Sequence, residues 1–249
     1  MRIIKVPTAY YSQFSADYSL RYPAEGYGGW KKEKLDLNLS KTGFVVMHAW
    51  NPYSYDEYKG WYQAVEYLPR AKEILETTLP QLLETLRKHQ LKIYHIVDEK
   101  HIPFTKLANP GKDDVIISLE AFKSKYVFPG EENEPACKNV IRNPMLVGEN
   151  ESMLYNGEEL HELCLKDGIN HLIYSGFAIN FCLQYSPGNM NEMCNRGFMC
   201  SCIKETVTAV ENKESIIGEQ NKQYGLWLTS IKNGFVYNLE ELITALENS

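Results

Sequence analysis

Short apolar segments alternate along this chain with longer segments in which apolar residues recur every three or four positions. Residues 42–47 (Thr-Gly-Phe-Val-Val-Met) and 91–97 (Leu-Lys-Ile-Tyr-His-Ile-Val) are apolar runs of the length typical of buried strands. Residues 66–90 carry leucine and isoleucine at helical spacing, which predicts an amphipathic helix that kinks or restarts at Pro80. Strands joined by such a helix need a right-handed crossover, so the pattern favours a mostly parallel sheet.

The second half of the chain repeats this alternation. The segments expected there are a short strand at 140–141, a helix at 157–166, a strand at 171–175, a helix within 182–197, a strand at 198–203, a helix at 216–229, an edge strand at 235–236 and a closing helix at 239–246. We therefore predict an α/β, three-layer α/β/α Rossmann-like fold, with helices on both faces of a mostly parallel sheet.

Composition and charge narrow the classes of function. The net charge of −6 argues against a general nucleic-acid binder, because phosphate contacts need a basic face. No apolar stretch is long enough for a membrane span, and the first residues lack the apolar centre of a signal peptide. The six cysteines are too few and too unevenly spaced for a secreted disulfide framework. We expect a reduced, cytoplasmic protein.

Three strand ends of the predicted sheet carry reactive or charged side chains. Ligands bind at the carboxyl ends of parallel strands, and these ends carry His48, Arg142 and the turn from Gly176 to Cys182. The three side chains should therefore converge. Cys182 stands where a helix can begin, and the unsatisfied N–H groups of a helix start stabilise a thiolate. The alternative is a cysteine used as a small buried hydrophobe.

The stretch Gly-Phe-Ala-Ile-Asn-Phe-Cys-Leu, residues 176–183, resembles the nucleophile turn of the isochorismatase-like cysteine hydrolases, a superfamily that includes nicotinamidases and N-carbamoyl amidohydrolases. Residues 44–51 resemble the first strand of that family, and residues 140–142 lie where the family places a lysine. Residues 196–198 resemble the segment after the nucleophile helix. The resemblance covers residues 42–249.

This resemblance implies a mechanism and a set of roles. The thiolate of Cys182 attacks the carbonyl carbon of a small amide or carbamoyl compound, and water hydrolyses the resulting thioester without a cofactor or a metal. The backbone N–H groups of Ala178 and Cys182 form the oxyanion hole, and the peptide bond between Phe177 and Ala178 is cis. The family also implies a homo-oligomer, either a dimer or a tetramer.

Two positions depart from the family pattern. The first strand of the family ends in a catalytic aspartate where this chain has His48, and the lysine position holds Arg142. Histidine can take a thiol proton, whereas arginine keeps its positive charge and cannot act as an acid at neutral pH. Two hypotheses remain: a Cys–His hydrolase with a cationic stabiliser, or a catalytically inactive relative that binds a small molecule or a protein partner.

Aromatic residues are concentrated after the first strand. They predict a pocket for a small-molecule substrate or, equally, a subunit interface, because tyrosine and tryptophan are enriched in both settings. The predicted pocket residues are Trp50, Asn51, Tyr53, Trp61 and Phe177.

A metal site is disfavoured. Cys194, Cys200 and Cys202 have no Cys-x-x-Cys pair or nearby histidine, so they are interpreted as core cysteines. A third hypothesis is a metal-assisted hydrolase that uses His95 in the second strand, or Asp98 or His101 after it. The Asp-x-His spacing of nicotinamidases is absent.

Two segments fall outside the regular pattern. Residues 1–41 have no counterpart in the family and are interpreted as an aromatic-rich N-terminal extension packed on the domain of residues 42–249. Residues 98–139 contain several prolines and glycines, and we expect them to carry function or oligomer contacts.

Overall fold

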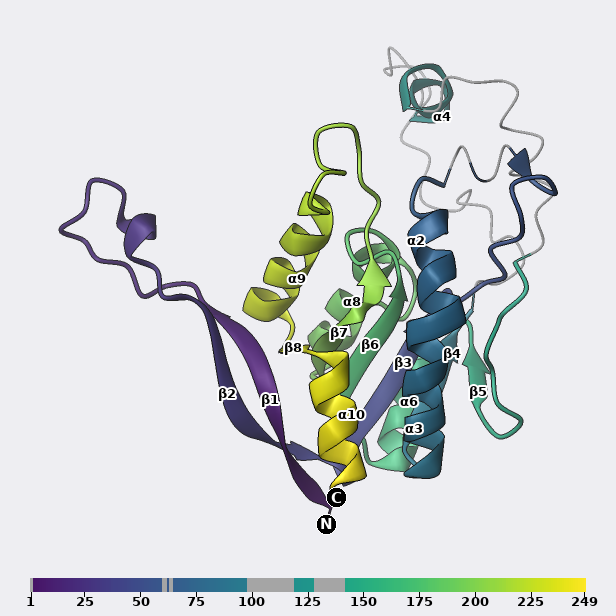
Figure 1. Cartoon of the computed structure of the whole chain (residues 1–249), viewed down its shortest axis with the longest axis horizontal. Helices are drawn as coiled ribbons and strands as arrows, with labels where there is room; N and C mark the ends of the chain where they lie inside the picture. The colour runs from purple at the N-terminus through teal and green to yellow at the C-terminus, as the bar shows by residue number, and fades with distance from the viewer. Residues whose placement is uncertain (1, 60–61, 63–64, 98–118, 128–141) are drawn as a thin grey trace.

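The computed structural model of this chain describes residues 2–59, 62, 65–97, 119–127 and 142–249, and these residues build one twisted sheet between two layers of helices (Figure 1). The strands lie in the order β2-β1-β8-β7-β6-β3-β4-β5. From β8 to β5 all neighbours are parallel, and β1 is antiparallel to both β2 and β8. The strands are β1 (Ile3–Ser12), β2 (Gly29–Asn38), β3 (Thr42–Met47), β4 (Lys92–Ile96), β5 (Ser152–Leu154), β6 (His171–Phe177), β7 (Met199–Thr208) and β8 (Val236–Tyr237).

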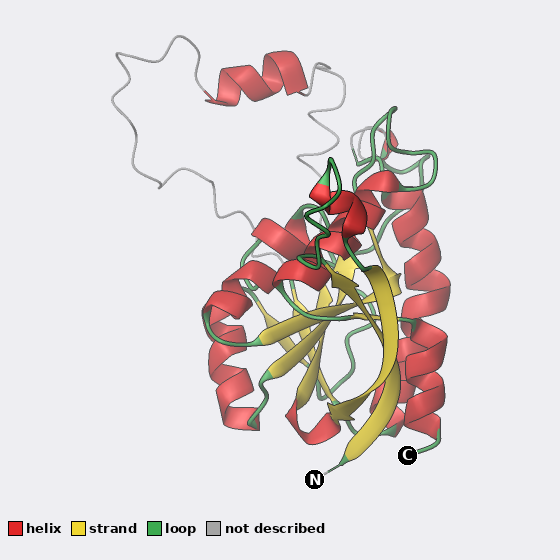
Figure 2. Ribbon diagram, turned by 90° about the vertical axis from the view of Figure 1, so that its left-hand side faces the viewer, coloured by secondary structure: helices red, strands yellow, loops and turns green. Residues whose placement is uncertain are grey.

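Helices cover both faces of the sheet (Figure 2). One layer contains α2 (Leu68–Glu73), the π turn η3 (Ile74–Thr78), α3 (Leu79–Lys88) and α10 (Leu239–Glu247). The other layer contains α6 (Gly157–Asp167), α7 (Cys182–Tyr185), α8 (Met190–Asn195) and α9 (Gln220–Lys232). Alternate residues of β3 belong to the two hydrophobic cores on opposite faces of the sheet. Phe44 and Val46 pack in the core on the side of α3, whereas Val45 and Met47 pack in the core on the side of α6. The predicted three-layer α/β fold is therefore confirmed.

Most predicted elements are present, with shifted ends. The predicted kink at Pro80 is the π turn η3, after which α3 begins with Pro80 in its first turn, where a missing N–H breaks no helical bond. The helix expected at 216–229 begins only at Gln220. The short elements of the structure are η1 (Pro23–Gly26), η2 (Leu39–Lys41), α4 (Leu119–Phe122) and the π turn η5 (Lys123–Val127). The predicted strand at 140–141 lies outside the described residues.

The N-terminal residues form a β-hairpin that extends the sheet. β1 and β2 pair over ten residues each, and the loop between them projects away from the body of the molecule (Figure 1). Phe14 and Tyr18 in this loop are both 87% exposed. The division of the chain at residue 41 stays a prediction. No helix in the described part of the chain is long and apolar enough to cross a lipid bilayer.

Candidate functional site

His48 directly follows the central strand β3 and lies in the left-handed backbone region, with φ +55°. Its N–H donates to the carbonyl of Ile96 at 2.9 Å, and this hydrogen bond keeps His48 at the end of the sheet although β3 has ended. The next residues pair with a second segment: the N–H of Asn51 donates to Asn143 O at 2.9 Å, and the N–H of Met145 donates to Ala49 O at 2.8 Å. This pairing carries the neighbouring Arg142 to the same strand end.

A stack of three side chains results. The imidazole of His48 and the indole of Trp50 are stacked, with ring centroids 4.5 Å apart and planes inclined by 16°. The guanidinium carbon of Arg142 lies over the Trp50 ring, 4.6 Å from its centroid, in cation–π geometry. The structure thus brings the predicted residues His48 and Arg142 together, because both side chains contact the ring of Trp50.

The electrostatic setting of His48 differs from that of an ordinary catalytic base. Its side chain is buried, with 4% of the residue exposed. Burial, and after it the positive charge of Arg142, lower the pKa of His48 to about 3. The imidazole is therefore neutral at physiological pH.

Cys182 begins α7, five residues after the end of β6. Between them the peptide bond Phe177–Ala178 is cis, and the carbonyl of Ala178 accepts hydrogen bonds from the N–H groups of Phe181 and Leu183 at 3.0 and 3.1 Å. This turn leaves Cys182 half-buried. Within the described part of the chain, the N–H groups of Ala178 and Cys182 donate to no other protein group. Two backbone donors of the turn that carries Cys182 therefore have no acceptor among the described residues.

Tyr67 is a site residue that the sequence did not reveal. Its ring stacks on Phe177 at 6.2 Å, and burial followed by the charge of Cys182 raises its pKa above the ordinary range of a phenol, while Arg142 acts in the opposite direction. The hydroxyl therefore stays protonated and lies within electrostatic reach of both Cys182 and Arg142. The helical periodicity of residues 66–90 marks Tyr67 only as part of a helix, so no local signal could have identified it.

Helix α2, which follows Tyr67, is fastened to the sheet beside the cysteine turn. Arg70 donates to Thr208 Oγ1 at 3.2 Å and to Ala209 O at 3.0 Å, and it forms an ion pair with Glu66 at 2.6 Å. The carbonyl of Thr208 in turn accepts the N–H of Ile179 at 2.9 Å. These contacts fix the position of Tyr67 relative to the turn that carries Cys182.

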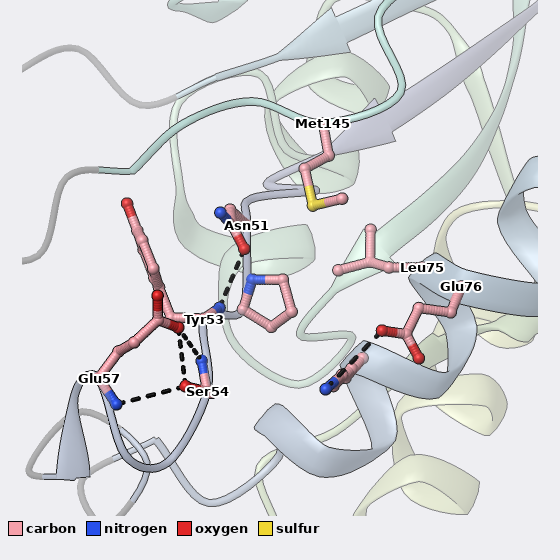
Figure 3. Close-up of a pocket in the computed structure, with 9 residues that line it drawn as sticks. Asn51, Tyr53, Ser54, Glu57, Leu75, Glu76 and Met145 are labelled. Atoms are coloured by element: carbon pink, nitrogen blue, oxygen red, sulfur yellow. Dashed lines mark hydrogen bonds and ion pairs between the residues drawn. The ribbon is translucent and has the colours of Figure 1, made fainter.

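Two hollows adjoin this site. A narrow cavity is lined by His48, Trp50, Asn51, Tyr67, Leu68, Ala71, Leu75 and Phe177. A wider hollow of about 530 Å³, counted with the open space at its mouth, is shared by the loop of Asn51 to Glu57, the helix residues Leu75 and Glu76, and Met145 (Figure 3). Of the predicted pocket residues, Trp50, Asn51 and Phe177 line the narrow cavity and Tyr53 lines the wider one. Trp61 lies outside the described residues.

Of the ligands considered for a metal-assisted hydrolase, only His95 belongs to the described residues, and it has another partner. Among the described residues no three histidine, cysteine or acidic side chains are placed to hold a metal ion, and Asp98 and His101 lie outside them. The buried His95 is 2.7 Å from a carboxylate oxygen of Glu151. Burial raises the pKa of Glu151, but this effect is outweighed by hydrogen bonds that lower the pKa to about 2. The largest of these contributions comes from Arg87.

The three cysteines of the predicted core differ from one another. Cys200 and Cys202 are fully buried, and burial raises the pKa of both thiols. Cys194 is half-buried, and hydrogen bonds from Cys200 and then Asn233 outweigh the effect of burial and lower its pKa to about 6. The chain therefore has an acidic thiol apart from the turn of Cys182.

No protein-family model and no curated protein sequence matches this chain. Among solved structures, a cysteine hydrolase from Pseudomonas syringae pv. phaseolicola 1448A superimposes with a TM-score of 0.52 at 12% identity, over 85% of this chain and 95% of that one. An isochorismatase family protein from Burkholderia thailandensis gives a TM-score of 0.45 at 16% identity, with 85% and 97% covered. A nicotinamidase from Staphylococcus aureus gives 0.42 at 12% identity, with 79% and 98% covered. This chain therefore has the fold of the Pseudomonas syringae cysteine hydrolase, while its chemistry depends on its own residues.

Proposed function

We propose that this protein is a cysteine-dependent hydrolase of a small amide or carbamoyl-type compound. The observation that carries the proposal is the pair of backbone N–H groups, at Ala178 and Cys182, that donate to no other described group beside the half-buried thiol. Preorganised donors of this kind stabilise the oxyanion of a tetrahedral intermediate. The fold shared with a cysteine hydrolase is consistent with this role.

In the proposed reaction the sulfur of Cys182 forms a bond to the carbonyl carbon, and the amine leaves with the proton of the thiol. Water then adds to the thioester, releases the acid and returns the proton to the sulfur. Arg142 and the protonated Tyr67 supply positive charge and a hydrogen-bond donor near the sulfur. His48 remains the candidate for the thiol proton, as a neutral imidazole rather than as part of a resting ion pair.

A second candidate function is ligand binding without turnover. The observation that favours it is the depressed pKa of His48, because an imidazole that is protonated only near pH 3 is a weak proton acceptor at neutral pH. Arg142 cannot substitute as an acid. Among the described residues, those that line the narrow cavity include no carboxylate.

The experiment that separates the two functions is the rate of alkylation of Cys182 by iodoacetamide against pH, read by mass spectrometry. It is done in a Cys194→Ser background, because Cys194 is itself acidic and would consume reagent. A hydrolase site predicts that Cys182 is alkylated at neutral pH much faster than an ordinary free cysteine. It also predicts that Arg142→Lys preserves this rate and that Arg142→Met lowers it, because the positive charge is the property in use. An ordinary alkylation rate of Cys182 in all three proteins would remove the proposal.

Turnover and binding are then measured on a panel of small amides and carbamoyl compounds. Hydrolysis that disappears in both Cys182→Ala and Cys182→Ser supports the hydrolase. Retained ligand affinity without hydrolysis in the unmodified protein supports the binding function.

We also propose that the chain forms a homo-oligomer. Aromatic side chains are exposed on the loop of the N-terminal hairpin, at Phe14 and Tyr18, and beside the thiol, where Phe181 is 54% and Tyr185 is 75% exposed. Size-exclusion chromatography with light scattering tests this directly: a dimer or tetramer supports it, and a monomer at micromolar concentration contradicts it.

A further inference from the structure

Two buried nitrogen atoms at the site have no hydrogen-bond partner in the described part of the chain: Nδ1 of His48 and Nε1 of Trp50. Buried polar atoms are nearly always paired, because an unpaired one loses its water without compensation. An exception in a native structure therefore needs a reason. Here the two exceptions belong to neighbouring rings.

The two rings line the same narrow cavity and are stacked with centroids 4.5 Å apart. The other side chains around the cavity are mostly apolar, and they come from helix α2, the π turn and the end of β6. His48 is only 4% exposed, so solvent does not reach its ring freely. A bound molecule in this cavity is the partner that would satisfy both nitrogens at once.

The chemistry of the two nitrogens defines that molecule. An indole N–H only donates, so the ligand must offer an acceptor to Trp50. Neutral imidazole has one donor and one acceptor nitrogen, so Nδ1 of His48 can accept from a ligand N–H. None of the described residues that line the cavity carries a charge when His48 is neutral, and Arg142 lies over the Trp50 ring without being part of this lining. A carboxylate would therefore lose its water in the cavity without a direct ion-pair partner among the lining residues.

We propose that His48 and Trp50 form the recognition subsite for the uncharged amide or ureido group of the substrate. The ligand oxygen accepts from Nε1–H of Trp50, and the ligand N–H donates to Nδ1 of His48. This inference rests on the proposed function for its location beside Cys182, and it narrows the substrate to neutral carbonyl compounds that carry an N–H. It also gives His48 a positioning role, as an alternative to a role in proton transfer, because the single acceptor nitrogen of the neutral imidazole is then engaged by the ligand N–H.

The test uses the indole N–H signals of the full-length Cys182→Ala protein in ¹⁵N-resolved NMR spectra, titrated with acetamide and, separately, with acetate. The signal of Trp50 is assigned by its loss in Trp50→Phe. Trp227 is an internal control, because its Nε1 already donates to Gln13 Oε1 at 3.0 Å. We expect acetamide to shift the Trp50 signal downfield while the Trp227 signal stays in place.

A His48→Phe variant tests the second hydrogen bond. It keeps a flat ring against Trp50 and should weaken acetamide binding about tenfold, the loss typical of one hydrogen bond. N,N-dimethylacetamide, which has no N–H, should bind the parent protein no better than acetamide binds the variant.

Two outcomes overturn the inference. A Trp50 signal that does not move with acetamide shows that the indole is not a recognition group, and an equal response to acetate shows that the subsite does not select uncharged ligands. Neither outcome depends on turnover. If Cys182 is rapidly alkylated but the Trp50 signal does not respond, the proposed hydrolase is supported and this subsite is rejected. If the Trp50 signal responds but Cys182 is not activated, the protein binds amides at this subsite without hydrolysing them.

Discussion

Acidification should destabilise this protein through His48, and the direction follows from its burial. The pKa of His48 is about 3 in the folded protein and about 6.5 in an exposed histidine. The unfolded chain therefore binds a proton more readily than the native one. The stabilisation is complete above pH 6.5 and is lost progressively as the pH falls from 6.5 towards 3.

The magnitude can be worked from the two pKa values. Between pH 6.5 and pH 3 each unit removes about 1.4 kcal/mol, so moving from pH 7.5 to pH 5 should lower the free energy of unfolding by about 2 kcal/mol through His48 alone. His171, at the start of β6, has its pKa lowered by burial to about 4 and should contribute about 2 kcal/mol over the same interval.

The assay is urea unfolding followed by circular dichroism at pH 7.5 and pH 5, in the parent protein and in His48→Phe. The readout is the difference between the two pH values, because the substitution also changes stability by repacking. Between pH 7.5 and pH 5 we expect the free energy of unfolding of His48→Phe to fall by about 2 kcal/mol less than that of the parent. His171→Phe is the matched variant, and its pH-dependent loss should be smaller than that of the parent by a similar amount. If His48→Phe loses as much stability as the parent on acidification, or if the His48 ring titrates near pH 6.5 by NMR, burial does not hold His48 neutral at the site.

Three further outcomes are expected. Gly176→Ala should lower the free energy of unfolding by at least about 3 kcal/mol, because φ is +118° and a Cβ would stand 1.9 Å from Met47 O. Gly197→Ala, where φ is also positive but nothing lies within 4 Å, should cost clearly less in the same urea assay. Glu151→Gln should lower the free energy of unfolding by up to about 3 kcal/mol at pH 7. The difference from the parent should shrink as the pH falls from 4.5 towards 2, and a difference at pH 3 as large as that at pH 7 would contradict this prediction. Cys194 should react with iodoacetamide at pH 7 in the folded protein, since its pKa is about 6, and complete protection would contradict that assignment.

The strands that the sequence predicted are those buried on both faces. β3 and β6 are buried along their whole length, so each is a continuous apolar run that can be recognised without the rest of the chain. β2 is mostly exposed and rich in lysine, and β5 has only three residues, so neither carries such a pattern. The hairpin of β1 and β2 joins the sheet through the pairing of β1 with β8, which is a long-range contact.

In the candidate site, too, some features can be predicted from the sequence and others depend on long-range contacts. The rule that parallel strands end at one edge of the sheet is enough to predict that His48 and Arg142 approach one another, and that Cys182 joins them stays a prediction. It does not predict that Trp50 joins His48 to Arg142, because that contact depends on the pairing of residues 49–51 with 143–145. Nor does it predict that Tyr67 reaches Phe177, because that contact depends on the packing of α2 against the sheet, which includes the hydrogen bond from Arg70 to the end of β7.

The α/β alternation, the layer order and the cysteine at the turn after β6 can be predicted from the amino-acid sequence alone, because apolar periodicity and glycine positions act over a few residues. The protonation state of His48, the unpaired nitrogens of His48 and Trp50, and the acidity of Cys194 follow instead from the tertiary structure. A pKa and a hydrogen-bond partner depend on burial and on charges brought from distant parts of the chain. The fold could therefore be predicted from the sequence, whereas the electrostatics of its site could not.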